Sequence, residues 1–285
     1  MKKLSHFTVI ALIFFGSSIW GDEIPEDSLR VMSFNIRLGV ANDGANRWEM
    51  RKELVVKTIK QYQPDLLGLQ EVFPMQEEYL KNNLRGYKYY GRSRLVDPKE
   101  GEACAVMYKN DRFNVLSEST FWLSEKPTEP GSKSWDSSLP RIANMIGLED
   151  KDAGGKKLFF INTHFDHRGK VAREESAKII AQRVIELESG SRVIVVGDFN
   201  SGEGSKPYKT LLDAGLFDTF RVFRPRKTDR ESTLSGWNGR VSGNRIDWVL
   251  CTPKLDVLSA SINRTHNGGR YPSDHYPVSS VLKYK

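Results

Sequence analysis

The sequence predicts a single α/β domain in which β-sheets pack together and helices cover their outer faces. Predicted strands outnumber predicted helices and are mixed in their connections, which favours packed mixed sheets. The most decisive stretch is RVIVVGDFNS, residues 192–201, whose β-branched run 193–196 contains no polar residue and is typical of a buried strand. Because no internal repeat or linker divides the chain, we expect one domain over residues 29–284.

Hydrophobic periodicity and turn residues place the other elements. In the first predicted helix, Leu54, Val55, Ile59 and Tyr62 fall on one face, opposite the charged residues. Helices are predicted at 50–62, 75–84, 171–187 and 207–213. Strands are predicted at 29–35, 65–70, 87–91, 103–108, 113–119, 142–149, 158–163, 193–196, 245–251, 257–262 and 278–282. Loops are predicted at 39–47, 124–140 and 221–231.

The first 21 residues have the pattern of an export signal. Lys2 and Lys3 precede a mostly apolar run, Phe7–Ile19, and the first acidic residue follows Gly21. Because the run is short for a membrane span, we favour a cleaved signal and an exported protein, periplasmic or secreted, over an uncleaved membrane anchor. No stable membrane span is expected after the signal is removed.

The formal net charge of +7 falls to +5 without the signal, which contains two lysines and no acid. This modest surplus permits a phosphate-bearing partner without requiring nucleic acid. Cys104 and Cys251 lie in apolar, strand-like runs, so buried free thiols are favoured over a disulfide, and neither a CxxC motif nor a zinc-type spacing is present. We expect a monomer.

Polar residues recur at the ends of predicted strands. Asp198 and Asn200, two residues apart at a strand exit, point the same way in an extended chain, although a plain turn would also use them. Each such residue alone could be a turn residue or cap, but together they supply carboxylates, amides and two histidines, with no candidate Ser or Cys nucleophile. The set is Asn35, Glu71, His164, Asp198, Asn200, Asp247, Asp274 and His275.

Oxygen donors without zinc-type spacing suit Mg²⁺ or Mn²⁺, which bind through carboxylates, waters and substrate phosphate. Such an ion would stabilise charge on a phosphoryl oxygen and promote attack by water. The sequence therefore predicts a metal-assisted phosphate chemistry.

Short motifs in a fixed order make the chain resemble the endonuclease/exonuclease/phosphatase superfamily, the relatives of DNase I. The motifs are FNIR at 34–37, LQE at 69–71, NTH at 162–164, GDFN at 197–200, RIDWV at 245–249 and SDHYPV at 273–278. The resemblance spans about residues 30–282 and implies a DNase I-like four-layer sandwich, two packed mixed β-sheets flanked by helices. Residues 205–212, SKPYKTLL, also resemble the deadenylase-like branch.

The resemblance implies a role for each matched residue. Glu71 would bind the metal with support from Asn35, and Asp274 would be a structural or second-metal carboxylate. Asp198 and His275 would be the acid/base groups, and Asp247 would orient His275. His164 would contact the phosphate, and Asn200 would bind the scissile phosphate. The metal and the two histidines would supply positive charge to the phosphoryl oxygens.

Further residues are candidates for substrate binding. Arg37 could contact phosphate or form a surface salt bridge. Asp166 could support the site or only its loop, and His167 is a weaker candidate beside it. Trp135 and Arg141 lie in or beside a loop long enough to cover the site, where Trp135 could stack on substrate.

The substrate is a phosphate ester, possibly nucleic acid, and a nuclease or small phosphodiesterase is the first choice. The Arg-Ile-Asp-Trp motif at 245–248 speaks against the inositol-phosphatase branch. A sphingomyelinase-like hydrolase is the alternative, weakened by the lack of an apolar hairpin for membrane insertion. A non-catalytic binding module is a remote alternative, because every acid/base residue is present. The basic stretch 221–230 could steer a polyanion or simply be solvated.

Overall fold

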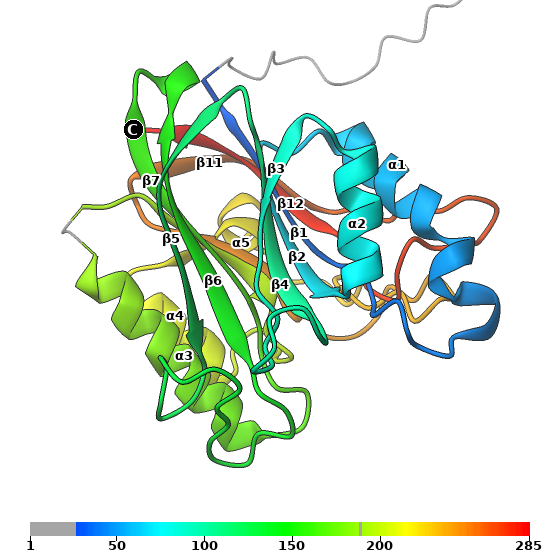
Figure 1. Cartoon of the computed structure of the whole chain (residues 1–285). Helices are drawn as coiled ribbons and strands as arrows, with labels where there is room; N and C mark the ends of the chain where they lie inside the picture. The colour runs from blue at the N-terminus through cyan, green and yellow to red at the C-terminus, as the bar shows by residue number, and fades with distance from the viewer. Residues whose placement is uncertain (1–26, 188–189) are drawn as a thin grey trace, which may run out of the picture.

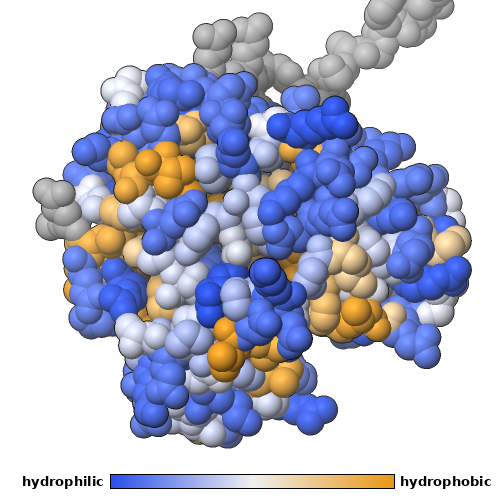
Figure 2. Space-filling model, viewed as in Figure 1, coloured by the Kyte–Doolittle hydropathy of each residue, from blue (hydrophilic) through white to orange (hydrophobic). Residues whose placement is uncertain are grey.

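The computed structural model describes residues 27–187 and 190–285, so the predicted export signal lies outside the described residues. Among the described residues, no helix combines the length and the apolar character needed to cross a membrane. The face shown in Figure 2 is mostly hydrophilic, and its apolar patches are small and separate.

Two six-stranded mixed sheets pack face to face, which confirms the predicted fold class (Figure 1). The first sheet has the order β11 (Leu255–Ile262), β12 (Val278–Tyr284), β1 (Leu29–Asn35), β2 (Leu66–Val72), β4 (Ala103–Lys109) and β3 (Tyr87–Tyr90). The second has the order β5 (Phe113–Trp122), β6 (Ile142–Asp150), β7 (Lys156–His164), β8 (Val193–Asp198), β10 (Asp247–Cys251) and β9 (Phe217–Asp218).

Helices cover the outer face of each sheet. On the first sheet these are α1 (Lys52–Tyr62) and α2 (Pro74–Asn83), and on the second they are α3 (Lys170–Glu186) and α4 (Lys206–Asp213) (Figure 1). A fifth helix, α5 (Thr219–Phe223), packs against β10 and β11.

Strand alternation divides the core into layers. Successive residues of a strand point to opposite faces, so Val31 packs between the sheets while Met32 packs under the first pair of helices. Likewise Val196 lies between the sheets and Val195 lies under α3 and α4. The four layers thus follow from apolar residues on both faces of the central strands.

Two glycines, in β2 and β8, allow close approach of neighbouring elements. A Cβ at Gly68 would lie 2.4 Å from a methyl group of Val196 on the opposite sheet. A Cβ at Gly197 would lie 2.3 Å from the carbonyl oxygen of Thr163 on β7. Larger residues would therefore push the elements that carry the site apart.

A buried polar pair also crosses between the sheets. Gln70 donates from Nε2 to Asn162 Oδ1 at 2.7 Å, and Asn162 donates to the carbonyl oxygens of Leu69 and Ala105. Because the Gln70 nitrogen and both ends of the Asn162 amide are paired, these hydrogen bonds help to fix how the sheets are aligned.

One loop prediction is wrong in part. The stretch 221–231 begins inside α5, which forms because Asp218 caps the amide of Phe220 at 3.0 Å and the Phe220 side chain is buried. Cys104 and Cys251 are buried free thiols, as predicted, and burial raises the pKa of Cys251 to about 12.

Candidate active site

The predicted site residues gather at one edge because of the strand directions. β1 is parallel to β2 and β7 is parallel to β8, whereas β12 and β10 run antiparallel to β1 and β8, respectively. A 3.1 Å hydrogen bond from Asn35 Nδ2 to Asp198 Oδ2 joins the two sheets at this edge, which we call the rim. The rim carries Asn35, Glu71, His164, Asp198, Asn200, Asp247, Asp274 and His275.

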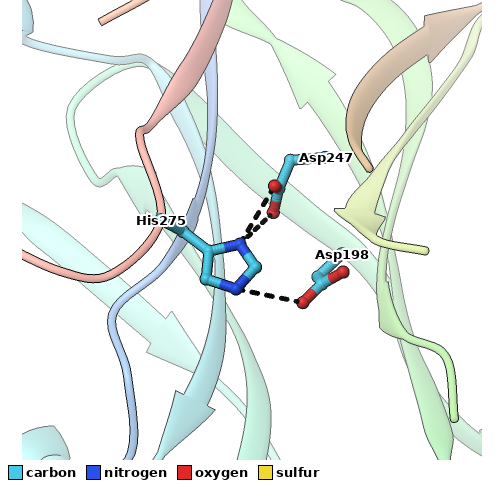
Figure 3. Close-up of side chains that lie close together, drawn as sticks. All are labelled: Asp198, Asp247 and His275. Atoms are coloured by element: carbon cyan, nitrogen blue, oxygen red, sulfur yellow. Dashed lines mark hydrogen bonds and ion pairs between the residues drawn. The ribbon is translucent and has the colours of Figure 1, made fainter. Parts of the chain in front are cut away.

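Asp198, Asp247 and His275 form a buried group at the rim (Figure 3). Asp247 lies directly opposite Asp198 in the β8–β10 register. His275 Nδ1 is 3.0 Å from one oxygen of Asp247, and its Nε2 is 3.7 Å from Asp198 Oδ2. The imidazole therefore lies between the two carboxylates, as the predicted Asp247–His275 pair requires.

This arrangement shifts the ionisation of both partners. Burial acts to lower the pKa of His275, but the carboxylates of Asp247 and Asp198 outweigh it and raise that pKa well above its ordinary value. Burial, together with the neighbouring Asp247 carboxylate, raises the pKa of Asp198 to about 7. His275 is thus a cation at neutral pH, and Asp198 can gain or lose a proton there.

His164 is a second imidazole beside Asp198. Its Nε2 lies 3.4 Å from Asp198 Oδ2. Burial and the nearby guanidinium groups of Arg141 and Arg94 lower its pKa well below the ordinary value. His164 is therefore neutral at pH 7, so the expectation that both histidines carry positive charge is corrected for this one.

Sequence reasoning missed Glu102, which lies behind His164. Its Oε1 is 3.6 Å from His164 Nδ1 and 3.4 Å from Arg141 Nη1, and it also accepts a hydrogen bond from Arg94. The residue stands at the end of a charged stretch, 97–102, where nothing distinguishes it from solvated acids. Its position directly before the apolar strand β4 was the available signal.

Glu71 reaches the rim through a β-bulge. The β2–β4 register shifts between Leu69 and Val72, and Glu71 has a φ of 63°, a left-handed conformation that is costly for a residue with a Cβ. Its carboxylate accepts hydrogen bonds from Asn35 Nδ2 at 3.0 Å and from the Leu38 amide at 2.8 Å. The bulge directs the side chain to the rim, and these two hydrogen bonds hold its carboxylate beside Asn35.

The amide of Asn35 is fully engaged. Its oxygen accepts a 2.9 Å hydrogen bond from the Arg37 amide, so its nitrogen faces the carboxylates of Glu71 and Asp198. Asn35 thus aligns both acids by donation, in keeping with a supporting role at a metal site.

Asn200 follows β8 in a left-handed conformation with a φ of 47°. Its backbone amide donates to Asp198 Oδ1 at 2.9 Å, and its Nδ2 donates to the Phe165 carbonyl at 3.0 Å. This turn orients Asp198 and keeps Asn200 at the rim.

Arg37 forms the salt bridge that was the alternative to phosphate contact. It pairs with Asp43 through two contacts, at 2.9 and 3.0 Å. Its Nε also lies 3.8 Å from Asp274 Oδ2, so the pair borders the rim. The Asp274 side chain is partly exposed, and its other oxygen accepts a 3.2 Å hydrogen bond from Ser273.

Asp166 supports the loops beside the site. Its buried carboxylate accepts hydrogen bonds from the Ser138 hydroxyl at 2.7 Å and from the amides of Arg168 and Gly169 at 2.9 and 2.7 Å. It therefore joins the long loop 124–140 to the segment after β7.

Arg141 is buried and points inward, toward three polar groups. Its guanidinium lies 3.5 Å from Asp166, 3.4 Å from Glu102 and 3.0 Å from His167 Nδ1. Trp135 is half-buried in the same loop with a φ of 54°. Substrate binding by Arg141 and Trp135 stays a prediction.

The rim has the donors for a divalent cation. Asp198, Asp247 and His275 offer ligand atoms within 4.8 Å of one another. However, His275 is charged and is already hydrogen-bonded to Asp247, so this group is a poor metal site. Glu71 and Asp274 are the further carboxylates. Ser273, next to Asp274, donates to the carbonyl oxygen of Asn35, whose side chain donates to Glu71. These oxygen donors fit a hard divalent ion.

Comparison with known proteins agrees with this geometry. The family model described as "Endonuclease/Exonuclease/phosphatase family" matches residues 32–275. The chain is 25% identical to Nocturnin of Drosophila melanogaster over 92% of its own length, but it spans only 48% of that relative.

Two solved bacterial structures are similar over nearly their whole length. An endonuclease/exonuclease/phosphatase from Bacteroides vulgatus is 32% identical, with a TM-score of 0.84 over 90% of this chain and 99% of that one. A mannosyl-6-phosphatase from Bacteroides thetaiotaomicron is 30% identical, with a TM-score of 0.80 over 90% and 100%. The chain belongs to the endonuclease/exonuclease/phosphatase family, whose enzymes are hydrolases acting on phosphate esters.

Proposed function

We propose that the protein is a Mg²⁺- or Mn²⁺-dependent phosphodiesterase, with a nuclease or a small phosphodiesterase as the first choice. The observation that carries this proposal is the position of Asp198 between a charged and a neutral imidazole, 3.7 Å from His275 and 3.4 Å from His164. A carboxylate that handles a proton beside a fixed cation is what hydrolysis of an ester of phosphoric acid needs.

Each residue at the rim has a part in the proposed reaction. Asp198 takes a proton from the attacking water, while the Asn200 and Asn35 hydrogen bonds keep its oxygens in place. His275, held by Asp247, stabilises negative charge on the phosphoryl oxygens. His164, being neutral, donates or accepts a hydrogen bond there.

Glu71 would hold the metal ion, aligned by Asn35, and Asp274 would be the nearby second carboxylate. When bound, the ion supplies positive charge to the phosphoryl group.

The candidate substrates follow from the similar proteins. Nocturnin and a Candida albicans protein named as a 3′-5′-exoribonuclease subunit are among the relatives, the latter 26% identical over 85% of this chain. A sugar phosphate is the second candidate, favoured by the full-length likeness to the mannosyl-6-phosphatase.

Turnover of bis-(p-nitrophenyl) phosphate tests the reaction. Asp198→Asn and His275→Asn should each lower turnover at least ~100-fold with the fold retained. EDTA should abolish turnover, and added Mg²⁺ or Mn²⁺ should restore it. Asp256→Asn and His266→Asn, both at exposed positions, are the matched controls. Wild-type turnover by either rim variant would refute the assignment.

A substrate panel decides between the candidates. The panel contains single- and double-stranded DNA, RNA, mannose 6-phosphate, sphingomyelin and inositol phosphates. Cleavage of nucleic acid supports the first choice, and release of phosphate from the sugar phosphate alone supports the second. If only sphingomyelin is cleaved, both are wrong, and no turnover with any divalent ion favours a binding module.

A further inference from the structure

A cavity separate from the rim lies between α5 and the end of β11. It has a volume of about 640 Å³, and none of the rim residues lines it. Its walls come from α5 and the segment that follows it, and from the end of β11 and the segment that follows that strand. We call it the α5–β11 pocket, and its main lining residues are Phe223, Arg224, Arg226, Arg230, Ile262 and Arg264.

The walls of the α5–β11 pocket carry uncompensated positive charge. Arg224, Arg226, Arg230 and Arg264 all line it, and none pairs with a carboxylate within the described part of the chain. The acidic lining residue, Glu231, is already bound to other groups of the protein.

The contacts of Glu231 show why it does not neutralise the pocket. One oxygen is 2.6 Å from Arg221 Nη2, and the other accepts a 3.0 Å hydrogen bond from the Thr228 amide. Four guanidinium groups around one concave surface favour an anion with several oxygen atoms, such as phosphate.

Apolar surface lies beside these charges. Phe223 is 42% exposed, which is unusual for a large aromatic ring, and the Arg224 guanidinium lies 5.5 Å from its centroid. Pro225 and Ile262 line the same cavity. An exposed ring next to arginines suits a planar base attached to a phosphate.

The pocket is connected by backbone to the active site. Ile262 pairs with Val278, three residues after His275. Leu234, which follows the basic segment, forms a bridge with His275 itself. A ligand in the pocket would therefore lie on the elements that hold one side of the rim.

We propose that the α5–β11 pocket is a second binding site, which holds a nucleotide of a single-stranded nucleic acid through its phosphate and base. The proposal deepens the proposed nuclease function and rests on it for the identity of the substrate. Binding does not require hydrolysis, so the two proposals can fail separately.

Fluorescence anisotropy with a labelled single-stranded oligonucleotide tests the site, using the full chain with His275→Asn in EDTA so that cleavage is suppressed. Adding Arg224→Gln and Arg226→Gln should weaken binding at least tenfold and lower the slope of log Kd against log salt by about 1.4. The control pair is Arg85→Gln and Lys88→Gln, both exposed, near β3 at the opposite edge of the first sheet. It should bind within about twofold of the parent.

Phe223→Ser tests the base contact. Because the ring is exposed, the variant should fold, and binding should weaken about fivefold or more if a base stacks on it. Adenosine monophosphate should then compete with the oligonucleotide better than inorganic phosphate does. Equal competition by the two would contradict the base contact.

Equal affinity of the arginine variant and its control, or no binding by the parent, would overturn the proposal. Turnover of bis-(p-nitrophenyl) phosphate by the arginine variant on an otherwise wild-type chain should stay unchanged, since this small ester does not reach the pocket. If the wild-type chain does not hydrolyse bis-(p-nitrophenyl) phosphate at all, the proposed function is refuted instead.

Discussion

Asn35 on β1 donates a 3.1 Å hydrogen bond to Asp198 on β8, so an amide of one sheet holds a carboxylate of the other. The same nitrogen donates to Glu71 at 3.0 Å. Asn35→Ala would leave two buried carboxylates without this donor and should lower the free energy of unfolding by about 1–3 kcal/mol.

Urea unfolding measures the effect of Asn35→Ala, and ester turnover should fall with it. Asn114→Ala is the control, because Asn114 also donates to a carboxylate, that of Glu149 at 3.0 Å, but on the exposed surface. It should change stability by less than about 0.5 kcal/mol. If both substitutions lower the free energy of unfolding equally, the hydrogen bond between the sheets contributes no more to stability than a surface hydrogen bond.

Asp247→Asn removes the charge that keeps His275 protonated. Asp247 is the main group that raises the pKa of His275 against the effect of burial. In the wild type, the stabilisation from this pair is therefore present below the unfolded pKa of histidine and is lost as pH rises through the elevated folded pKa. In the variant, His275 should lose its proton at a lower pH, and turnover should fall at least ~100-fold.

The titration of His275 can be followed by NMR on the protein in EDTA, with its signal among the five imidazoles identified by its loss in His275→Asn. An unchanged midpoint for His275 in Asp247→Asn would contradict the role given to this carboxylate.

Asp166 should make the protein more stable at neutral than at acid pH. Burial acts to raise the pKa of Asp166, but hydrogen bonds from Gly169, Ser138 and Arg168 outweigh it and hold the pKa below its ordinary value. Its stabilisation is therefore present above the unfolded pKa and is lost as pH falls through the folded pKa.

Asp166→Asn should accordingly lower the melting temperature at pH 7, and the difference from wild type should shrink below about pH 4. Thermal unfolding over this pH range measures it, with Asp229→Asn as the exposed control. A difference that stays constant with pH would mean that the ionised carboxylate is not the stabilising form.

Arg51 should be sensitive even to substitution by lysine. The side chain is buried, with 1% of its surface exposed, and its guanidinium lies over the rings of Trp48 and Trp237. The guanidinium donates hydrogen bonds to four backbone carbonyl oxygens, those of Asn46, Ile36, Arg37 and Pro272. An ammonium group cannot reproduce this planar set of donors.

We expect Arg51→Lys to cost about 2–4 kcal/mol of unfolding free energy, measured in urea. Arg47→Lys, an exposed change four residues earlier, should be neutral. If Arg51→Lys is also neutral, the guanidinium is not what fixes the loop that contains Pro272.

The site residues at strand ends could be predicted, because each is a polar residue that directly follows an apolar run. The β1 strand has the predicted bounds, 29–35, and polar residues at its end and at the ends of β7 and β8 do lie together. The family motifs then indicated which distant strands meet, which periodicity alone does not.

Other features depend on contacts between distant segments, and the local sequence marks them only weakly or not at all. The bulge at Glu71 appears only when β2 pairs with β4, and Glu102 becomes distinct only when Arg141 and His164 pack against it. α5 has five residues, and its capping by Asp218 and the packing of Phe220 outweigh a basic sequence that favours a loop.

The order of the strands along the chain has a consequence for biosynthesis. β1–β4 build the first sheet and β5–β10 build the second, after which the chain returns to the first sheet as β11 and β12. A ribosome that has translated as far as Ile262 has made every strand of the second sheet, but it has not yet made His275. The rim is therefore complete only after β12 has been made and has docked beside β1. Truncation before residue 275 would remove His275 together with β12, the strand that lies between β11 and β1.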